Sequence, residues 1–254
     1  MNPVRVHANA FGPGLPARDL VLSPDHAIHA EGVLIPIRFL INGATITQEW
    51  PREITYYHLE LAAHDIILAE GLPAETYLDT GNRSAFANGG GAIMLHPDFA
   101  LRIWETKSCA PLATTGETVT LVRHTLLAQA TTIGHHRTTD PAVALTRTPT
   151  TTTLSSRHFT PAYIDPTATD HRRLGLPITR ITANGHNLPL DHPSLTTGWH
   201  APEPTHRWTT GHATIALNAR IAIETRPTPA VYWCARQEVS TGRRPAPAKG
   251  REAL

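Results

Sequence analysis

The sequence predicts a mainly β protein with one or two short helices near its middle. Many short segments rich in β-branched residues are separated by closely spaced turn signals, which is typical of small sheets. Asn-Gly pairs at Asn42-Gly43 and Asn184-Gly185 lie between apolar residues and indicate tight hairpins. Prolines interrupt any helical run, so no helix longer than about two turns is expected over residues 19–78. The prolines in question are Pro16, Pro24, Pro36, Pro51 and Pro73.

The segment over residues 17–78 is expected to form a series of short strands. Residues 54–61 carry β-branched and aromatic side chains in partial alternation, and Glu70-Gly71 marks a turn between the last two strands. In chain order, strands are predicted at residues 19–22, 27–30 and 32–37, on both sides of the Asn-Gly turn within 41–46, and at 54–61, 66–69 and 73–78.

The composition then changes to a polar, glycine-rich stretch over residues 79–91, where a domain boundary is expected. One helix is predicted to begin at residues 97–98 and run through Trp104, and another to cover 121–130 and end near Gly134. The predicted organisation is a compact β domain at 1–80, a linker at 81–95, a second, mostly β domain at 96–240, and a disordered tail at 241–254.

The later part of the chain returns to strand-like patterns. Residues 146–153 are rich in threonine and fit either a strand or a linker. Residues 178–182 alternate before the Asn184-Gly185 turn, and residues 208–217 are expected to pair with 219–223 around Asn218.

The composition excludes several classes of protein. A formal net charge of +1 over 254 residues does not give the basic surface of a nucleic-acid binder. No apolar run approaches the roughly 20 residues of a membrane span, and no signal peptide is visible, so the localisation stays open. Cys109 and Cys234 are too few for a disulfide framework or a four-cysteine zinc site, and whether they pair is undecided.

No metal and no organic cofactor is expected. His135 and His136 are adjacent, and His206 and His212 have no cysteine or carboxylate at ligand spacing. The glycine run at 89–91 lacks the later glycine and lysine of a phosphate-binding loop. The oligomeric state is not determined by these patterns.

A Ser-Pro-Asp-His block at residues 23–26 directly follows a predicted strand. With its flanking stretches at 16–22, 32–36 and 40–44, the block resembles the conserved Thr/Ser-x-x-His region of Hint domains. These are the autoprocessing modules that hedgehog proteins and inteins share, and the resemblance is to their bacterial members. It implies a Hint-type compact β fold over residues 1–80.

Hint domains break a peptide bond by attack of an adjacent thiol or hydroxyl group on the preceding carbonyl. The resemblance implies that His26 transfers the proton to the leaving nitrogen, a role that suits an imidazole. It implies that Ser23 holds the scissile bond by hydrogen bonding. The residues alone also fit an ordinary arrangement, in which Ser23 caps a turn and His26 is a hydrogen-bonded core residue.

A second block, at residues 56–71, resembles the later Hint region in which a strand leads to a histidine, an aliphatic strand and a glycine. His64 falls on the histidine position, and His58 falls where inteins often carry Asp or Cys. The resemblance adds both to the candidate catalytic residues. The residues alone also fit His58 on the polar face of a strand and His64 in an exposed turn.

The chain departs from the self-cleaving pattern in its first residues. Residues 1–22 contain no cysteine, Cys109 and Cys234 lie downstream of both blocks, and the terminal His-Asn of splicing inteins is absent. The resemblance therefore covers only the C-terminal half of a Hint domain, and an inactive fragment or degenerate relative is expected. Its substrate would be its own upstream polypeptide, and relatives are often linked to surface or secreted proteins.

A non-catalytic β-sandwich that binds carbohydrate is the alternative. Trp199 and Trp208 lie in charge-poor, strand-like segments, and exposed indole rings stack on sugars. Both tryptophans are equally typical of the core of a β-sheet.

Overall fold

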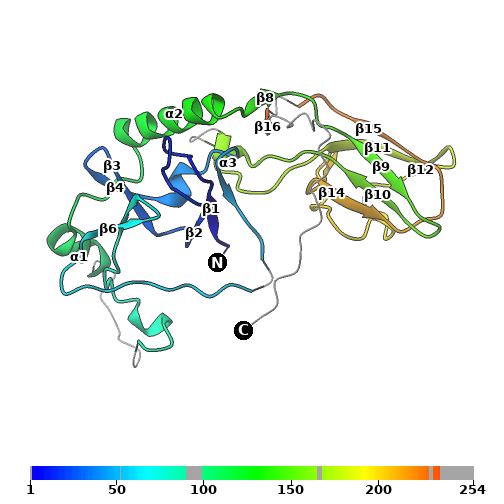
Figure 1. The fold of residues 1–254 in the computed structure, drawn as a ribbon. Helices are drawn as coiled ribbons and strands as arrows, with labels where there is room; N and C mark the ends of the chain where they lie inside the picture. Colours follow the sequence, from blue (N-terminus) through cyan, green and yellow to red (C-terminus); the bar gives the residue numbers. More distant parts are fainter. Residues whose placement is uncertain (1, 52, 90–98, 165–167, 229–230, 235–254) are drawn as a thin grey trace, which may run out of the picture.

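The computed structural model describes residues 2–51, 53–89, 99–164, 168–228 and 231–234. Figure 1 shows an N-terminal and a C-terminal lobe, with helix α2 (Glu117–Thr132) running along the N-terminal lobe towards the other. Small antiparallel sheets make up both lobes, which confirms the mainly β fold class.

Two sheets build the N-terminal lobe. In the first, β1 (Val4–Val6) lies between β2 (Leu20–Leu22) and β5 (Ile46–Gln48) and is antiparallel to both. Burial alternates along β1, with both valines buried and Arg5 partly exposed between them, as the two-residue period of a strand requires.

The second sheet carries the candidate site. It consists of two hairpins, β3 (Ala27–Ala30) with β4 (Val33–Pro36) and β6 (Ile66–Ala69) with β7 (Leu72–Glu75), joined between β3 and β7. Each hairpin turns through a Glu-Gly pair with positive φ at both residues, a turn that matches the right-handed twist of the strands.

One hydrophobic cluster fills the N-terminal lobe and extends to α2. Val119, Val122 and Leu126 follow helical spacing and pack with buried residues of both sheets. Helix α2 therefore shares the core of the N-terminal lobe, although the predicted domain limits place it in the second domain. Those limits remain a prediction.

Shorter helical segments surround this core. The 3₁₀ segments are η1 (Ile37–Leu40) and η2 (Arg83–Ala85), and α1 (Phe99–Lys107) precedes α2. Helices α1 and α2 confirm the predicted helical part of the chain, although residues 97–98 lie outside the described residues. Helix α2 ends just before Gly134, whose φ is 97°. In the described part of the chain, none of the helices has the length and apolar character needed to cross a membrane.

A second hydrophobic cluster forms the core of the C-terminal lobe. Its larger sheet pairs β11 (Pro177–Ala183) with β12 (His186–Leu188), β13 (Arg207–Trp208) and β15 (Ile221–Thr225). The remaining elements are β9 (Ala144–Arg147), β10 (Thr152–Ser155) and β14 (His212–Ile215) in a second sheet, β8 (His136–Thr138) paired with β16 (Tyr232–Cys234), and the short helix α3 (Pro161–Ile164).

Several local predictions are confirmed. The regular structure described between residues 19 and 78 consists of strands and η1. Asn184 and Gly185, with φ of 52° and 83°, form the turn of the β11–β12 hairpin. The threonine-rich stretch 146–153 belongs to the β9–β10 hairpin. The predicted disordered tail at 241–254 lies outside the described residues.

The predicted hairpin at Asn42-Gly43 is wrong. Asn42 Oδ1 accepts the backbone amides of Ala44, Thr45 and Ile46 at 2.9, 2.9 and 3.0 Å. A side chain that bonds its own neighbouring amides in this way closes a local turn and competes with a strand ladder. The segment is therefore a turn between η1 and β5.

Two further strand predictions are wrong. Residues 54–61 are extended but form no strand. Ile54, Tyr56 and His58 are half-buried and their neighbours are exposed, so the alternation is present without a partner strand. Residues 208–217 do not pair with 219–223, because β14 pairs with β10 and β15 pairs with β11. Both strands find partners distant in sequence, which local patterns do not encode.

Candidate active site

His26 lies in the turn that leads from β2 into β3. Its amide donates to the carbonyl of Ser23 at 3.1 Å, and its own carbonyl accepts the amide of Ile37 at 2.9 Å. An ion pair between Asp25 and Arg38 joins the same turn to η1. Backbone bonds on both sides thus fix the main chain that carries the His26 imidazole.

The His26 imidazole packs against that of His58. The two ring centroids are 5.4 Å apart, with the planes inclined by 43°. His58 also meets Tyr77 and Phe86 edge-on, at centroid distances of 5.9 and 5.2 Å. The structure therefore brings two of the predicted site residues together and surrounds the second with aromatic rings.

A polar pocket of about 100 Å³ opens beside His58. Arg83 on its wall is held by the carboxylates of Glu60 and Asp79. A volume of about 100 Å³ corresponds to roughly three water molecules, enough for one small side chain. The lining residues are His58, Glu60, Tyr77, Arg83, Phe86, Asn88 and Gly89.

His64 lies against Glu75, the last residue of β7. The distance from His64 Nε2 to Glu75 Oε2 is 3.4 Å, and the two side chains are 1% and 10% exposed. The other carboxylate oxygen of Glu75 accepts the amide of Ala27 at 2.7 Å. Glu75 thus connects His64 to the residue that follows His26, and His64 is not the exposed turn residue that the residues alone allowed.

The segment after α1 covers His64. The Cys109 amide donates to His64 Nδ1 at 3.2 Å, and the Trp104 ring meets the imidazole edge-on at 5.8 Å. Cys109 and Cys234 are free thiols, which answers the open question of their pairing. Burial raises the pKa of the Cys109 thiol, which makes it a poor nucleophile at neutral pH.

Burial shifts the pKa values of the site in opposite directions. It lowers the pKa of His26 from 6.5 to about 4; the charge of His58 acts the same way, and a hydrogen bond with the Glu75 backbone opposes it. Burial raises the pKa of Glu75 from 4.5 to about 7, although the Ala27 amide opposes it. Burial also lowers the pKa of His58 and of His64, so all three imidazoles are neutral at neutral pH.

Ser23 is half-buried, and its backbone carbonyl accepts the hydrogen bond from the His26 amide. That contact fits a residue that closes the turn. A role for the Ser23 hydroxyl in holding a scissile bond remains a prediction.

Three residues of the site, Glu75, Tyr77 and Phe86, were not predicted from the sequence. Glu75 carried a signal, because it follows the buried Leu72 and Ala74 in an apolar strand, where a carboxylate requires a buried partner. Tyr77 and Phe86 carried none, since Tyr77 lies in the predicted strand 73–78 and Phe86 in the predicted linker 81–95.

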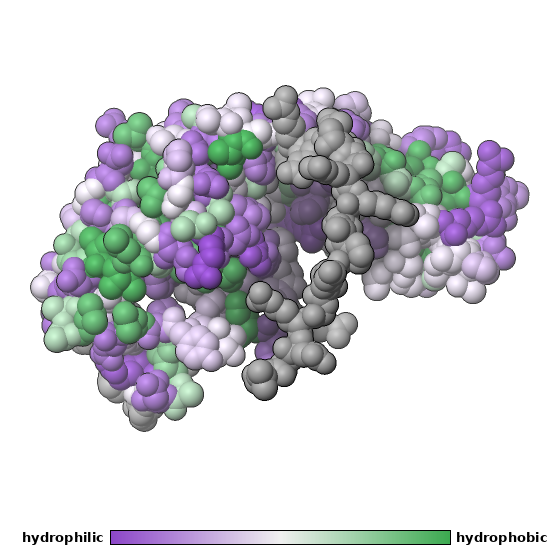
Figure 2. Space-filling view, viewed as in Figure 1, coloured by the Kyte–Doolittle hydropathy of each residue, from purple (hydrophilic) through white to green (hydrophobic). Residues whose placement is uncertain are grey.

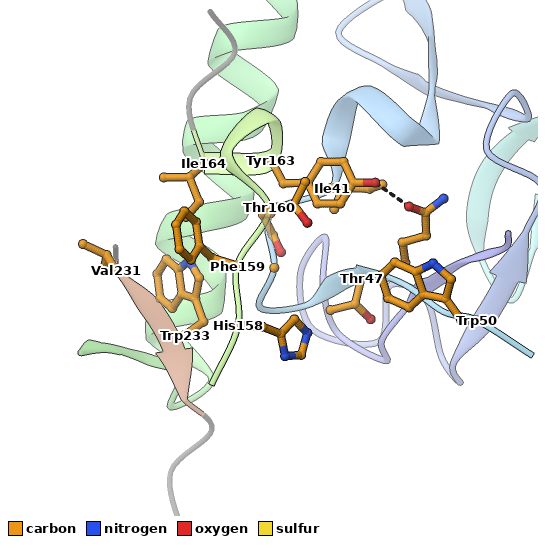
Figure 3. A pocket seen from close by; sticks show the side chains of 13 residues that line it. Ile41, Thr47, Trp50, His158, Phe159, Thr160, Tyr163, Ile164, Val231 and Trp233 are labelled. Atoms are coloured by element: carbon orange, nitrogen blue, oxygen red, sulfur yellow. Dashed lines mark hydrogen bonds between the residues drawn. The ribbon is translucent and has the colours of Figure 1, made fainter. Parts of the chain in front are cut away.

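A second pocket, of about 100 Å³, lies away from the candidate residues, none of which lines it. Figure 3 shows it enclosed by Trp50, Phe159, Tyr163 and Trp233, with the Tyr163 hydroxyl bonded to Gln48. Its walls come from both lobes, between which the surface in Figure 2 is hollowed.

The two tryptophans of the carbohydrate alternative have structural partners. Trp208 is buried at 6% exposure. Trp199 donates from Nε1 to the Thr214 carbonyl at 3.0 Å, and the Arg207 guanidinium lies over its ring. Trp208 therefore fits the core role, and the partly buried Trp199 packs against the hydrophobic cluster of the C-terminal lobe.

Comparison with known proteins adds one finding. Residues 1–81 match the family model described as Hint domain. The match includes both histidine-bearing blocks, the strands β1 to β7, and Glu75. Searches of curated proteins and of solved structures found no match to the chain.

Proposed function

We propose that the Hint domain at the N-terminus of this chain is related to autoproteolytic and protein-splicing modules and that His26 moves the proton at a peptide bond. The domain itself rests on the match over residues 1–81 and on the mainly β fold. The observation that most supports the activity is the His26–His58 ring pair, 5.4 Å apart, beside a polar pocket.

The half-buried His26 suits a proton transfer in two steps. With a pKa of about 4 it is neutral at neutral pH, so it can accept the proton of an attacking thiol or hydroxyl group. Once protonated, it is a stronger acid than a solvated imidazole and readily protonates the leaving amide nitrogen. In this proposal the Ser23 hydroxyl holds the scissile bond, and His58 and His64 support the site.

The nucleophile is not among residues 1–22, which contain no Cys, Ser or Thr. Cys109 touches His64 through its amide, but its thiol has a raised pKa. We therefore propose that the 254-residue chain does not cleave itself. His26 would act on a bond in its own upstream polypeptide, where a nucleophile-bearing segment is joined to the chain.

Mass spectrometry of two preparations tests this proposal. The 254-residue chain is expected to remain one species of 27.7 kDa for days in neutral buffer, with or without added thiol. The second preparation carries, ahead of the chain, the nucleophile-bearing segment of a self-cleaving Hint domain and a short peptide. Thiol-dependent release of that peptide is expected, because intramolecular placement removes roughly 7–11 kcal/mol of the barrier.

Replacement of the added nucleophile by alanine is the matched control and should abolish the release. Cleavage of the unextended chain would show that its own residues hold a nucleophile. An extended chain that stays intact would show that the domain is a scaffold without this activity.

A further inference from the structure

Glu75 is the only buried acidic residue among the described residues. Its carboxylate is shared between two partners, since Oε1 accepts the Ala27 amide at 2.7 Å while Oε2 faces His64 Nε2 at 3.4 Å. Its backbone also bonds to the His26 ring. One residue thus touches both histidine-bearing blocks of the Hint domain.

The contact on the other side of His64 determines where its proton lies. Nδ1 accepts the Cys109 amide at 3.2 Å, so it carries no proton. The neutral ring must therefore carry its proton on Nε2, the atom that faces Glu75. Neither Nε2 nor Oε2 has a hydrogen-bond partner, and a small rotation of the imidazole that turns the Nε2–H onto Oε2 would satisfy both.

This carboxylate lacks the partner that would make it an ordinary structural ion. Among the ion pairs of the described residues, Glu75 pairs with His64 and with no Arg or Lys. A buried carboxylate without a fixed cation destabilises a fold, and such groups are concentrated at functional sites. The titratable groups around it are His26, His58, His64, Asp25, Asp65 and Cys109.

We propose that Glu75 is a positioning residue for His26. Its carboxylate links His64 to the main chain beside His26 through the Ala27 amide, and its backbone bonds the His26 ring. Together these contacts hold the His26 imidazole in one orientation against His58. This inference deepens the proposed function and rests on it for the consequence in cleavage. The geometric part can be tested without any cleavage.

NMR of the histidine ring nitrogens in the full ¹⁵N-labelled chain is the test. We expect His26 and His64 each to show one neutral tautomer, and both to record a titration near pH 7, the pKa of Glu75. In Glu75→Gln, the amide can still accept from Ala27, but its NH₂ faces the Nε2–H of His64, donor against donor. The shared titration should vanish from both rings. The His64 ring should also populate mixed tautomers, whereas the His26 ring keeps its bond to the backbone of residue 75 and should lose only the titration near pH 7.

Glu70→Gln is the matched control, because Glu70 lies in the turn of the same hairpin and pairs with Arg18 instead. It should leave both rings unchanged. Unchanged tautomers and titrations in Glu75→Gln would overturn the inference. If that variant does not fold, the side-chain carboxyl ¹³C signal of Glu75 in the unsubstituted chain gives the test. A carboxyl that titrates at a pH different from that of both rings would also overturn the inference.

The extended chain separates this inference from the proposed function. Glu75→Gln should slow thiol-dependent cleavage by up to about 100-fold, as expected for a displaced catalytic group, and change its pH profile. If the extended chain never cleaves while the rings of His26 and His64 still titrate together with Glu75, that result would contradict the proposed function and leave the positioning role intact. Cleavage at an unchanged rate in Glu75→Gln removes the positioning role alone.

Discussion

At the scale of single residues, burial favours the uncharged forms of both His26 and Glu75. The pKa of His26 falls to about 4 and that of Glu75 rises to about 7. His26 is charged only below about pH 4 and Glu75 only above about pH 7, so both groups are uncharged between these values. Stability should therefore depend on pH with opposite signs for the two residues.

Glu75 should destabilise the fold as pH rises. Its pKa is higher in the folded chain, so its stabilising contribution is complete below pH 4.5 and is lost as pH rises through about 7. The shift limits this loss to about 3 kcal/mol. Thermal unfolding of Glu75→Gln should therefore lack the loss of stability expected for the unsubstituted chain between about pH 4.5 and pH 7, whereas Glu70→Gln should retain it. An identical pH dependence in all three proteins would contradict the burial of this carboxyl.

His26 should lower the stability of the fold as pH falls. Its pKa is lower in the folded chain, so its contribution is complete above pH 6.5 and is lost as pH falls towards about 4. Unfolding of His26→Gln should show a weaker loss of stability over that interval. His29→Gln, in the neighbouring strand β3, should retain the full loss. If both variants behave alike, His26 is more solvated than the structure shows.

At the scale of elements, local signals predicted turns better than strands. Glu70-Gly71 and Asn184-Gly185 both turn hairpins, because positive φ is a property of the residues themselves. Residues 54–61 have strand-like composition but no strand partner, and Asn42 diverts its segment through side-chain bonds to the backbone. Strand formation depends on distant partners, and a local pattern does not contain them.

Two glycines in the C-terminal lobe allow the cost of a left-handed backbone to be distinguished from the cost of a steric clash. Gly185 and Gly198 have φ of 83° and 77°, but a Cβ at Gly198 would lie 1.8 Å from the His212 carbonyl oxygen, whereas one at Gly185 meets nothing within 4 Å. Gly185→Ala should lower the free energy of unfolding by about 1–2 kcal/mol for the left-handed backbone. Gly198→Ala should lower it further, by about 1–3 kcal/mol for overpacking. Denaturant unfolding that gives equal losses would contradict the close approach to β14.

At the scale of the whole molecule, the candidate site lies within the N-terminal lobe, while the C-terminal lobe has its own hydrophobic cluster. The resemblance in sequence predicted the Hint fold and named His26, His58 and His64. It did not predict Glu75, because the bond between its carboxylate and the Ala27 amide forms only when β7 pairs with β3. Sequence blocks thus indicated the histidines, and tertiary pairing supplied the group that connects them.

The rate of thiol-dependent cleavage in the extended chain, compared between His26→Ala and His29→Ala, tests the central claim most directly. Loss of a general acid–base group should slow His26→Ala by about 10²–10⁴-fold. His29→Ala, a substitution of the same type three residues further along the chain, should cleave at the unsubstituted rate. Equal rates in the two variants would contradict the assignment of proton transfer to His26.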